Sequence, residues 1–357
     1  KDLRALKRKH GDARRTRIQT AAQRAAESAA LAEAIEEVSE EALVLEFTQR
    51  GYVRRSTLKA FQRQQAKQES LLTTELAETE DVTLQIESTT TKQDLLMLTR
   101  SGKAYTVAVG EISNTTRQSK GTPLVTLLPP TAQGDPEAIA AQFILAPPLE
   151  NQELVLVTQQ GRIKRLPLTE FANLTGRGLM AMKLKEDDEL QSAILVQSQT
   201  HLIVVASGGR LLRFAIDDEQ LPIQSRTTQG LQALRLSKQE QMAGGIALNA
   251  SDEFLVLSAQ GFAKRLKASQ LRIANRGELG VQAMQFATKT DKVIGIAPAP
   301  RDAELTILTN TDRVARVPID QIALMGRDGS GDRLVKLGRG EKLMRWAIVE
   351  VPLAESD

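Results

Sequence analysis

A hairpin-like pattern recurs along this chain about every 50 residues, a period typical of propellers and solenoids. The most regular copy, Leu154–Phe171, has an apolar run, a polar pair before Gly161, and a second run that alternates basic and apolar residues. This pattern predicts two antiparallel strands joined by a tight turn, with glycine where φ must be positive. The other copies are Leu43–Phe61, Leu95–Ile112, Leu202–Leu221, Phe254–Leu271 and Leu305–Ile322, and the last has Asp312 in place of the glycine.

Each repeat continues with a loop that carries arginine and usually glycine, followed by two further apolar segments. The segments after the loops predict strands at Leu124–Leu128, Leu179–Leu184, Leu231–Leu236, Val281–Phe286 and Leu334–Leu337. Closing strands are predicted at Gln191–Val196, Met242–Leu248, Val293–Ala297 and Arg345–Val351. A lone four-stranded sheet is marginal and exposes its edges, whereas radial packing protects them. We therefore expect an all-β fold, a six-bladed propeller-like disc.

The predicted domain boundary falls where the repeats begin. Residues 1–40 are densely charged and rich in helix formers, so we expect a helical tail and linker. Residues 41–353 should form the disc. Its predicted blades are 41–92, 93–150, 151–199, 200–251, 252–300 and 301–353.

The composition argues against several kinds of site. The chain has no cysteine and only two histidines, so thiolate or histidine metal centres and a Ser-His-Asp triad are disfavoured, and we expect no cofactor. No apolar run reaches the roughly 18 residues of a membrane span. These features favour a cytoplasmic protein with no membrane partner. Because the chain begins at Lys1 rather than methionine, we expect it to be part of a longer protein.

Net charge is only +3, so a nucleic-acid role depends on where the basic residues lie. The hairpin set is Arg50, Arg54, Arg55, Arg100, Lys103, Arg162, Lys164, Arg165, Arg210, Arg213, Lys264, Arg265, Arg313 and Arg316. The loop set is Arg63, Lys67, Arg117, Lys120, Arg177, Arg226, Arg276 and Arg327. Recurrence at corresponding positions predicts a positive track along one rim of the disc, suited to phosphate contacts. Aromatic content of 3% disfavours single-strand binding by base stacking.

Other polar features have simpler interpretations. Tyr52 and Tyr105 are interpreted as strand packing residues, and His201 as an edge residue. Glu186–Glu189 is interpreted as a solvated turn rather than a divalent-metal site. Gly326–Gly331 lacks the lysine and the following helix of a phosphate-binding loop, so we expect it to be a blade loop.

Three segments carry a family resemblance: Lys7–Thr16, Gly51–Arg54 and Arg117–Pro129. Together they resemble the C-terminal domain of the bacterial type IIA topoisomerase A subunit, of the gyrase or topoisomerase IV type. Thr126 stands where the family has asparagine. The resemblance implies a β-pinwheel whose neighbouring blades exchange a strand, and duplex DNA wrapped on its basic rim. It also implies that the catalytic tyrosine lies upstream, so that this part is not an enzyme by itself. The implied partners are double-stranded DNA, the ATPase B subunit, and the other A chain of a homodimer, at the nucleoid.

One segment departs from the family pattern. Gyrase carries a box of sequence Gln-Arg-Arg-Gly-Gly-Lys-Gly in its first blade. The matching positions are Gln62, Arg63, Gln64, Gln65, Ala66, Lys67 and Gln68, which lack the second arginine and all three glycines. A loop without glycine approaches a phosphate backbone less closely, so the departure predicts weakened chiral wrapping.

Three functions remain open at this point. The first is a DNA-wrapping or DNA-guiding domain, either gyrase-like or, with weak wrapping, topoisomerase IV-like. The second is a propeller that binds other proteins through its faces. The third, an enzyme built on a propeller, is disfavoured by the scarcity of histidine and of converging acids and bases.

Overall fold

The computed structural model describes residues 40–68, 77–78, 81–115, 119–133, 139–172, 174 and 177–349. The described residues from Glu41 onward form one compact unit. In the part of the chain that the structure describes, α3 (Leu58–Gln68) is the one α-helix and strands predominate. The predicted helical tail lies outside the described residues, apart from Glu40. The repeat region confirms the all-β prediction.

The strands fall into four classes that recur in every repeat. The first hairpin strands are β1 (Ala42–Thr48), β5 (Asp94–Thr99), β9 (Glu153–Thr158), β13 (His201–Ala206), β17 (Glu253–Ser258) and β21 (Glu304–Thr309). The second hairpin strands are β2 (Tyr52–Thr57), β6 (Lys103–Ala108), β10 (Arg162–Pro167), β14 (Arg210–Ala215), β18 (Phe262–Lys267) and β22 (Arg313–Pro318). The inner strands are β4 (Thr83–Thr90), β8 (Ile139–Leu145), β12 (Leu190–Val196), β16 (Met242–Leu248), β20 (Val293–Pro298) and β24 (Leu343–Val349). The outer strands are β3 (Ala77–Glu78), β7 (Thr122–Pro123), β11 (Leu179–Met180), β15 (Leu231–Gln232), β19 (Val281–Gln282) and β23 (Asp332–Arg333).

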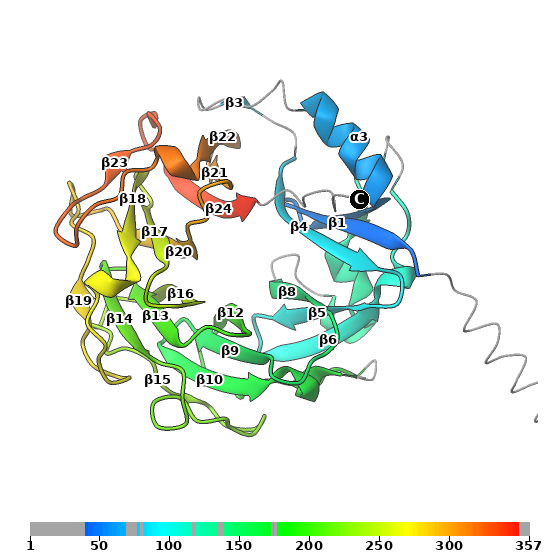
Figure 1. Cartoon of the computed structure of the whole chain (residues 1–357), viewed down its shortest axis with the longest axis horizontal. Helices are drawn as coiled ribbons and strands as arrows, with labels where there is room; N and C mark the ends of the chain where they lie inside the picture. Colours follow the sequence, from blue (N-terminus) through cyan, green and yellow to red (C-terminus); the bar gives the residue numbers. More distant parts are fainter. Residues whose placement is uncertain are drawn as a thin grey trace, which may run out of the picture. The chain divides into compact units, whose positions relative to one another are not determined.

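These strands form six four-stranded sheets, the blades, which we number by their hairpins from one to six. Figure 1 shows the blades arranged in a ring, with the inner strands around its centre. In each blade the inner strand pairs with the first hairpin strand, as β12 does with β9. The second hairpin strand then pairs with the outer strand, as β10 does with β15. The arrangement confirms the six-bladed propeller prediction.

The outer strand of every sheet comes from a different repeat. β15 follows the fourth hairpin in sequence but completes the sheet of the third. β3, from the first repeat, pairs with β22 and so completes blade six. The predicted blade ranges therefore mark sequence repeats rather than whole sheets. Each blade is tied to the next repeat because that repeat supplies its missing edge.

Hydrophobic clusters fill the junctions between consecutive blades. One cluster joins Val155 and Val157 of blade three to Val204 and Phe214 of blade four. Further clusters lie between blades one and two, two and three, four and five, and five and six. A first hairpin strand such as β9 is covered on both faces by the adjacent blades, since Val155 and Val157 belong to one cluster and Leu154 and Leu156 to another. Burial on both faces explains the nearly continuous apolar sequence of these strands. At the remaining junction, β4 lies beside β24.

The strands predicted after the arginine loops are shorter than expected. Leu231–Leu236, for example, contributes only Leu231 and Gln232 to a ladder, and Leu124–Leu127 forms the 3-10 turn η3. The outer strand ends at Gln232 because its partner strand begins at Arg162. The next residue, Ala233, donates its amide to Gly161 O in the hairpin turn at 2.8 Å, and a turn offers no further ladder positions. The remaining 3-10 turns are η2 (Val109–Glu111), η4 (Pro130–Ala132), η5 (Leu168–Phe171), η6 (Ala268–Gln270) and η7 (Ile319–Gln321).

The hairpin turns follow the predicted design. Gly161 has a φ of +85° and its amide donates to Thr158 O at 3.1 Å. Asp312 occupies the corresponding position of blade six with a φ of +57°, a conformation that aspartate tolerates better than most residues.

Candidate nucleic-acid interface

The fourth residue of the second hairpin strand is an arginine in five blades, and most of these arginines are buried. Arg55, Arg165, Arg213 and Arg265 are at most 8% exposed. Contrary to the prediction, these four side chains are not on the rim surface. Their position in the strand directs them into the junction with the following blade. Arg316, the fifth member, is partly exposed.

The buried arginines donate hydrogen bonds across the blade junctions. Arg213 Nη1 donates to Ala268 O at 2.9 Å and to Leu271 O at 3.2 Å, both at the η6 turn of blade five. Arg265 Nε donates to Ile322 O at 2.7 Å, beside the η7 turn of blade six. The carbonyls at the ends of these 3-10 turns, Leu271 O and Ile322 O, thus find donors in the preceding blade.

Arg55 makes the same kind of contact from blade one, with Nη1 2.8 Å from Gly110 O. Arg165 instead pairs with Glu153 of its own blade at 3.3 Å and with Asp218 of the next repeat. We conclude that this arginine position fastens the blades to one another.

The third residue of the second strand also departs from the prediction in two blades. Lys164 and Lys264 are 0% exposed, and neither has an ion pair in the described residues. Lys164 Nζ donates to Arg226 O at 2.7 Å, and Lys264 Nζ donates to Arg327 O at 2.8 Å. Burial lowers the pKa of both lysines to about 8. These side chains hold the arginine loops and do not themselves reach solvent.

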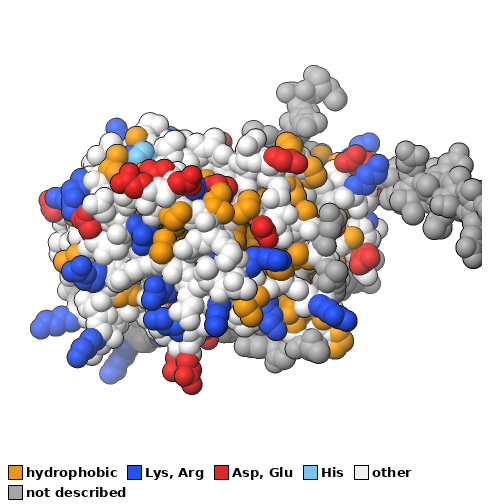
Figure 2. All heavy atoms as spheres, turned by 90° about the horizontal axis from the view of Figure 1, so that it is seen from below, with side chains coloured by type: hydrophobic (Ala, Val, Ile, Leu, Met, Phe, Trp, Pro, Cys, Tyr) orange, Lys and Arg blue, Asp and Glu red, His pale blue; other side chains and the backbone are white. Residues whose placement is uncertain are grey.

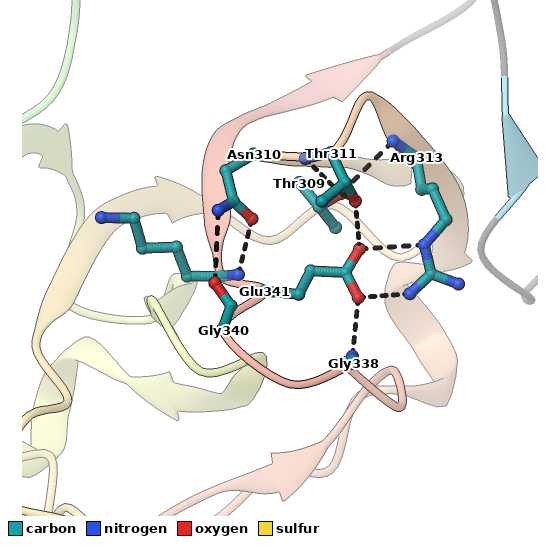
Figure 3. Close-up of polar contacts among 8 residues, drawn as sticks. Thr309, Asn310, Thr311, Arg313, Gly338, Gly340 and Glu341 are labelled. Atoms are coloured by element: carbon teal, nitrogen blue, oxygen red, sulfur yellow. Dashed lines mark hydrogen bonds and ion pairs between the residues drawn. The ribbon is translucent and has the colours of Figure 1, made fainter.

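In blades four and six, the first residue of the second hairpin strand is an arginine whose positive charge is partly neutralised by a glutamate. Arg210 pairs with Glu240, and Arg313 pairs with Glu341. Figure 3 shows Glu341 between the Arg313 guanidinium, the Thr311 hydroxyl at 2.7 Å and the Gly338 amide at 2.7 Å. The Arg313 hydrogen bonds hold the pKa of the Glu341 carboxyl well below its usual range. The pair organises the blade edge and reduces its positive charge.

The remaining predicted cations of the described residues lie at or near the surface. Lys103, Lys120, Arg177, Arg226 and Arg327 are exposed, and Arg162 is partly exposed. Arg50 is exposed, while Arg54 and Arg100 are partly exposed beside Asp81 and Glu189. Arg276 is only partly exposed because its guanidinium turns inward to Gln220 O and Gln232 O. Arg117 lies outside the described residues.

The segment that matches the gyrase box is helical rather than a loop. Gln62–Gln68 lies within α3, and Arg63 is exposed on it. Gln, Ala and Lys are good helix formers, whereas the glycines of the gyrase sequence would disfavour a helix by about 1 kcal/mol each. The loop expectation for Arg63 and Lys67 is therefore wrong for this chain.

The structure also exposes cations that the hairpin pattern did not single out. They follow the outer strands, just beyond the hairpin turn of the neighbouring blade: Lys183, Lys185, Arg235, Lys238, Lys336 and Arg339. The signal was present as basic residues alternating with apolar ones in Leu179–Leu184 and its counterparts. The strand interpretation of these segments does not single it out, because alternation of polar and apolar residues is what any half-buried strand shows.

On the side of the ring that Figure 2 draws, the charged side chains are distributed unevenly. Figure 2 shows one side of the ring, on which Lys and Arg gather along one half and Asp and Glu form a row along the other. Acidic residues begin several first hairpin strands, as Asp94, Glu153, Glu253 and Glu304 do, at the end away from the hairpin turns. The basic half thus corresponds to the turn side of the blades.

The other polar features are structural. Tyr105 is 5% exposed within the core between blades one and two. Asp188, from the Glu186–Glu189 turn, accepts hydrogen bonds from Thr158 Oγ1 at 2.7 Å and Gln160 N at 3.0 Å, and so caps a hairpin turn. Among the described residues, no cluster of acidic residues or histidine is suited to a metal ion, and no helix is long and apolar enough to cross a membrane.

A sequence model of the DNA gyrase C-terminal domain, a beta-propeller, matches residues 93–130, 152–197, 200–248, 252–300 and 303–350. The chain is 36% identical over 270 residues to the A subunit of DNA topoisomerase 4 from Synechocystis sp., covering 71% of this chain and 29% of that protein. It is 28% identical over 347 residues to the A subunit of DNA gyrase from Mycolicibacterium smegmatis, covering 97% and 40% respectively. The chain therefore spans less than half the length of these two relatives.

Two solved structures have the same fold. The C-terminal domain of DNA topoisomerase IV aligns with a TM-score of 0.73 at 20% identity, covering 88% of this chain and 94% of that one. The DNA gyrase A C-terminal domain aligns with a TM-score of 0.65 at 20% identity, covering 87% and 100%.

Proposed function

Because the chain belongs to the DNA gyrase C-terminal domain family, we propose that it is the duplex-DNA-binding domain of a type IIA topoisomerase A subunit. The observation that carries this proposal is the recurrence of exposed cations at corresponding places on blades two, three and five. Lys183, Arg235 and Lys336 follow three different outer strands, and Arg177, Arg226 and Arg327 lie on three of the loops. A duplex that follows the rim would meet such a cation group at blades two, three and five.

The proposed mode is phosphate contact without base reading. Arginine and lysine side chains on a convex edge can neutralise phosphates of any sequence, and binding is then opposed by the energy of bending the duplex. The acidic row on the other half of the rim repels phosphate and confines the duplex to the turn side. In the whole enzyme, the domain would guide a DNA segment to a cleavage gate formed by a pair of A subunits that work with the ATPase subunit. The catalytic tyrosine would belong to a part upstream of this chain.

We further propose that chiral wrapping is weak, as in a topoisomerase IV-like domain. The helical form of Gln62–Gln68 supports this proposal, because a helix satisfies its own backbone amides and offers few of them to a phosphate. The exposed Arg63 still provides one cation on blade one.

The test of DNA binding is the salt dependence of duplex affinity. If the rim neutralises several phosphates, affinity for a duplex of about 40 base pairs should fall steeply between about 50 and 200 mM salt, with a log–log slope of about −0.9 for each contact. A shorter duplex should bind less tightly because it reaches fewer blades. A flat salt response, or equal affinity for both lengths, would refute the proposal.

Wrapping is tested separately by closing nicked circular DNA in the presence of the protein. The unaltered chain should give a small handed shift in linking number. The quadruple variant Gln64→Arg, Gln65→Gly, Ala66→Gly and Gln68→Gly should give a larger one. A large shift from the unaltered chain would contradict the weak-wrapping proposal and leave DNA binding itself unaffected.

A further inference from the structure

In several blades, a loop from the next repeat crosses over the third residue of the second hairpin strand. In blade three this loop is 224–230. Gln224 N donates to Arg165 O at 3.0 Å on one side of the crossing. On the other side, Gly230 has a φ of +74° and lies so close that a Cβ would be 2.5 Å from Ile163 O. Lys164 therefore lies directly beneath the loop.

Blade five has the same construction. Met325 N donates to Arg265 O at 3.0 Å, and a Cβ on Gly331 would be 2.6 Å from Ala263 O. Lys264 Nζ lies beneath, 2.9 Å from Gly326 O, 2.8 Å from Arg327 O and 2.6 Å from Gly329 O. The backbone carbonyls of the loop thus point inward, and one ammonium group binds three of them.

Blade four has the same loop crossing but no lysine at the third position of its second hairpin strand. Its crossing is equivalent, because Ala274 N donates to Arg213 O at 2.9 Å, but the residue beneath the loop is Leu212. Leucine has no donor, and here the loop's own Arg276 turns inward. Its Nη1 donates to Gln232 O at 2.8 Å and its Nε donates to Gln220 O.

The comparison separates two ways of fixing the same loop. In blade four the loop arginine is used as an internal anchor and is only partly exposed. In blades three and five a buried lysine supplies the donor, and Arg226 and Arg327 are exposed. The Arg226 side chain is 47% exposed, and within the described residues its one ion pair is at the surface, with Glu170 at 3.3 Å. Such a pair is weak enough to exchange for a phosphate.

We propose that Lys164 and Lys264 are positioning residues for DNA binding, which bind the inward carbonyls of their loops and so keep Arg226 and Arg327 directed at the phosphate backbone. This inference rests on the proposed function for its last step, since the arginines must meet DNA. Its first step, the ordering of the loops, concerns the chain alone. A buried ammonium whose hydrogen-bond partners are all carbonyls loses much of its hydration, and only for Lys264 does a nearby carboxylate, Asp328, favour the charged form. A leucine at the same position, as in blade four, would be expected unless the lysine had such a role.

The inference is tested with Lys164→Leu, which copies blade four, in the chain with and without Arg226→Ala. The salt slope of duplex affinity for Lys164→Leu should decrease in magnitude by about 0.9, as expected for the loss of one phosphate contact. The double variant should show no further loss, because Arg226 is then already misplaced. Lys103→Leu is the matched control, since it removes an exposed cation near the same rim. Its loss should add to that of Arg226→Ala.

Hydrogen exchange of the amides at residues 225–230 gives a readout that needs no DNA. Exchange should be faster in Lys164→Leu, unchanged in Lys103→Leu and largely restored in Lys164→Arg. Unchanged exchange in a folded Lys164→Leu protein, or a loss that adds to that of Arg226→Ala, would overturn the inference. If the unaltered chain fails to bind duplex DNA, the proposed function fails, and loop exchange still decides whether Lys164 orders its loop. If Lys164→Leu does not fold, the same exchange measurement on Lys164→Met and Lys164→Arg decides it.

Discussion

Replacing Arg265 by methionine should weaken the junction between blades five and six without weakening DNA binding. Arg265 Nε donates to Ile322 O at 2.7 Å, and Nη1 pairs with Glu253 at 3.0 Å. The two side chains are 9% and 15% exposed, so solvent replaces little of what is lost. Methionine keeps most of the packing of the aliphatic stem but supplies no donor.

The expected cost follows from these contacts. Breaking a buried ion pair from one side costs about 3–5 kcal/mol, because the remaining charge stays buried. Arg301 also lies 3.5 Å from Glu253 and is 73% exposed, so it can partly replace Arg265. We therefore expect the lower end, about 3 kcal/mol. With an m-value of about 3 kcal/mol per molar, the urea midpoint should fall by about 1 M.

The assay compares urea unfolding with the salt slope of duplex affinity. Arg265→Met should lower the midpoint and leave the slope unchanged, whereas Arg226→Ala should do the opposite. The double variant Arg265→Met with Glu253→Gln should lose less than the sum of the two single variants, since it leaves no unpaired charge. A midpoint shift below about 0.2 M, or a reduced salt slope, would refute the assignment of Arg265 to the blade junction.

Three other perturbations test the charges and turns of the blades. Glu341→Gln should destabilise the protein at neutral pH by about 1–2 kcal/mol, because a carboxylate that accepts several hydrogen bonds is lost. The pKa of Glu341 is depressed in the folded state, so the stability difference between the unaltered protein and Glu341→Gln should be present above about pH 4 and disappear at lower pH. Unfolding titrations in acid measure this difference, and a difference that does not change with pH would contradict the assignment. The folded-state pKa of Lys164 and Lys264 is about 8, against about 10.4 in the unfolded chain, so between these values the unfolded state holds more protons. The unaltered protein should therefore gain stability relative to a Lys164→Met, Lys264→Met variant as the pH rises from about 8 to about 10, and a loss would show that the lysines are not desolvated. Asp312→Gly should raise the thermal midpoint by an amount equivalent to about 0.5–1 kcal/mol, because glycine adopts a φ of +57° without strain. A lower midpoint would mean that the Asp312 carboxylate stabilises the turn by more than the strain of its backbone costs.

The sequence alone determined the number and order of the blades. Apolar runs separated by a polar pair and glycine encode a hairpin locally, and repetition of one hairpin leaves few ways to bury its faces except against its neighbours. Leu154–Phe171 therefore predicted both its own strands and their surroundings. The Asp312 turn was visible in the same way, because turn chemistry is a local property. The resemblance also supplied the strand exchange, which no single repeat reveals.

The tertiary structure decided which cations are available at the surface. In sequence, Lys164 and Arg162 look alike, since both are basic residues on the same short strand. Lys164 is buried because a loop from the next repeat crosses over it, and Arg165 is buried because the adjoining blade packs against it. Arg276 and Arg226 occupy equivalent loops, yet Arg276 turns to Gln220 O and Gln232 O while Arg226 stays exposed, and this difference cannot be seen in the sequence of either loop. The residue pattern of a strand determines which strands it pairs with, but not which other parts of the chain pack on its two faces. Contacts between repeats therefore decide which cations are buried with a structural role and which remain exposed and can meet DNA.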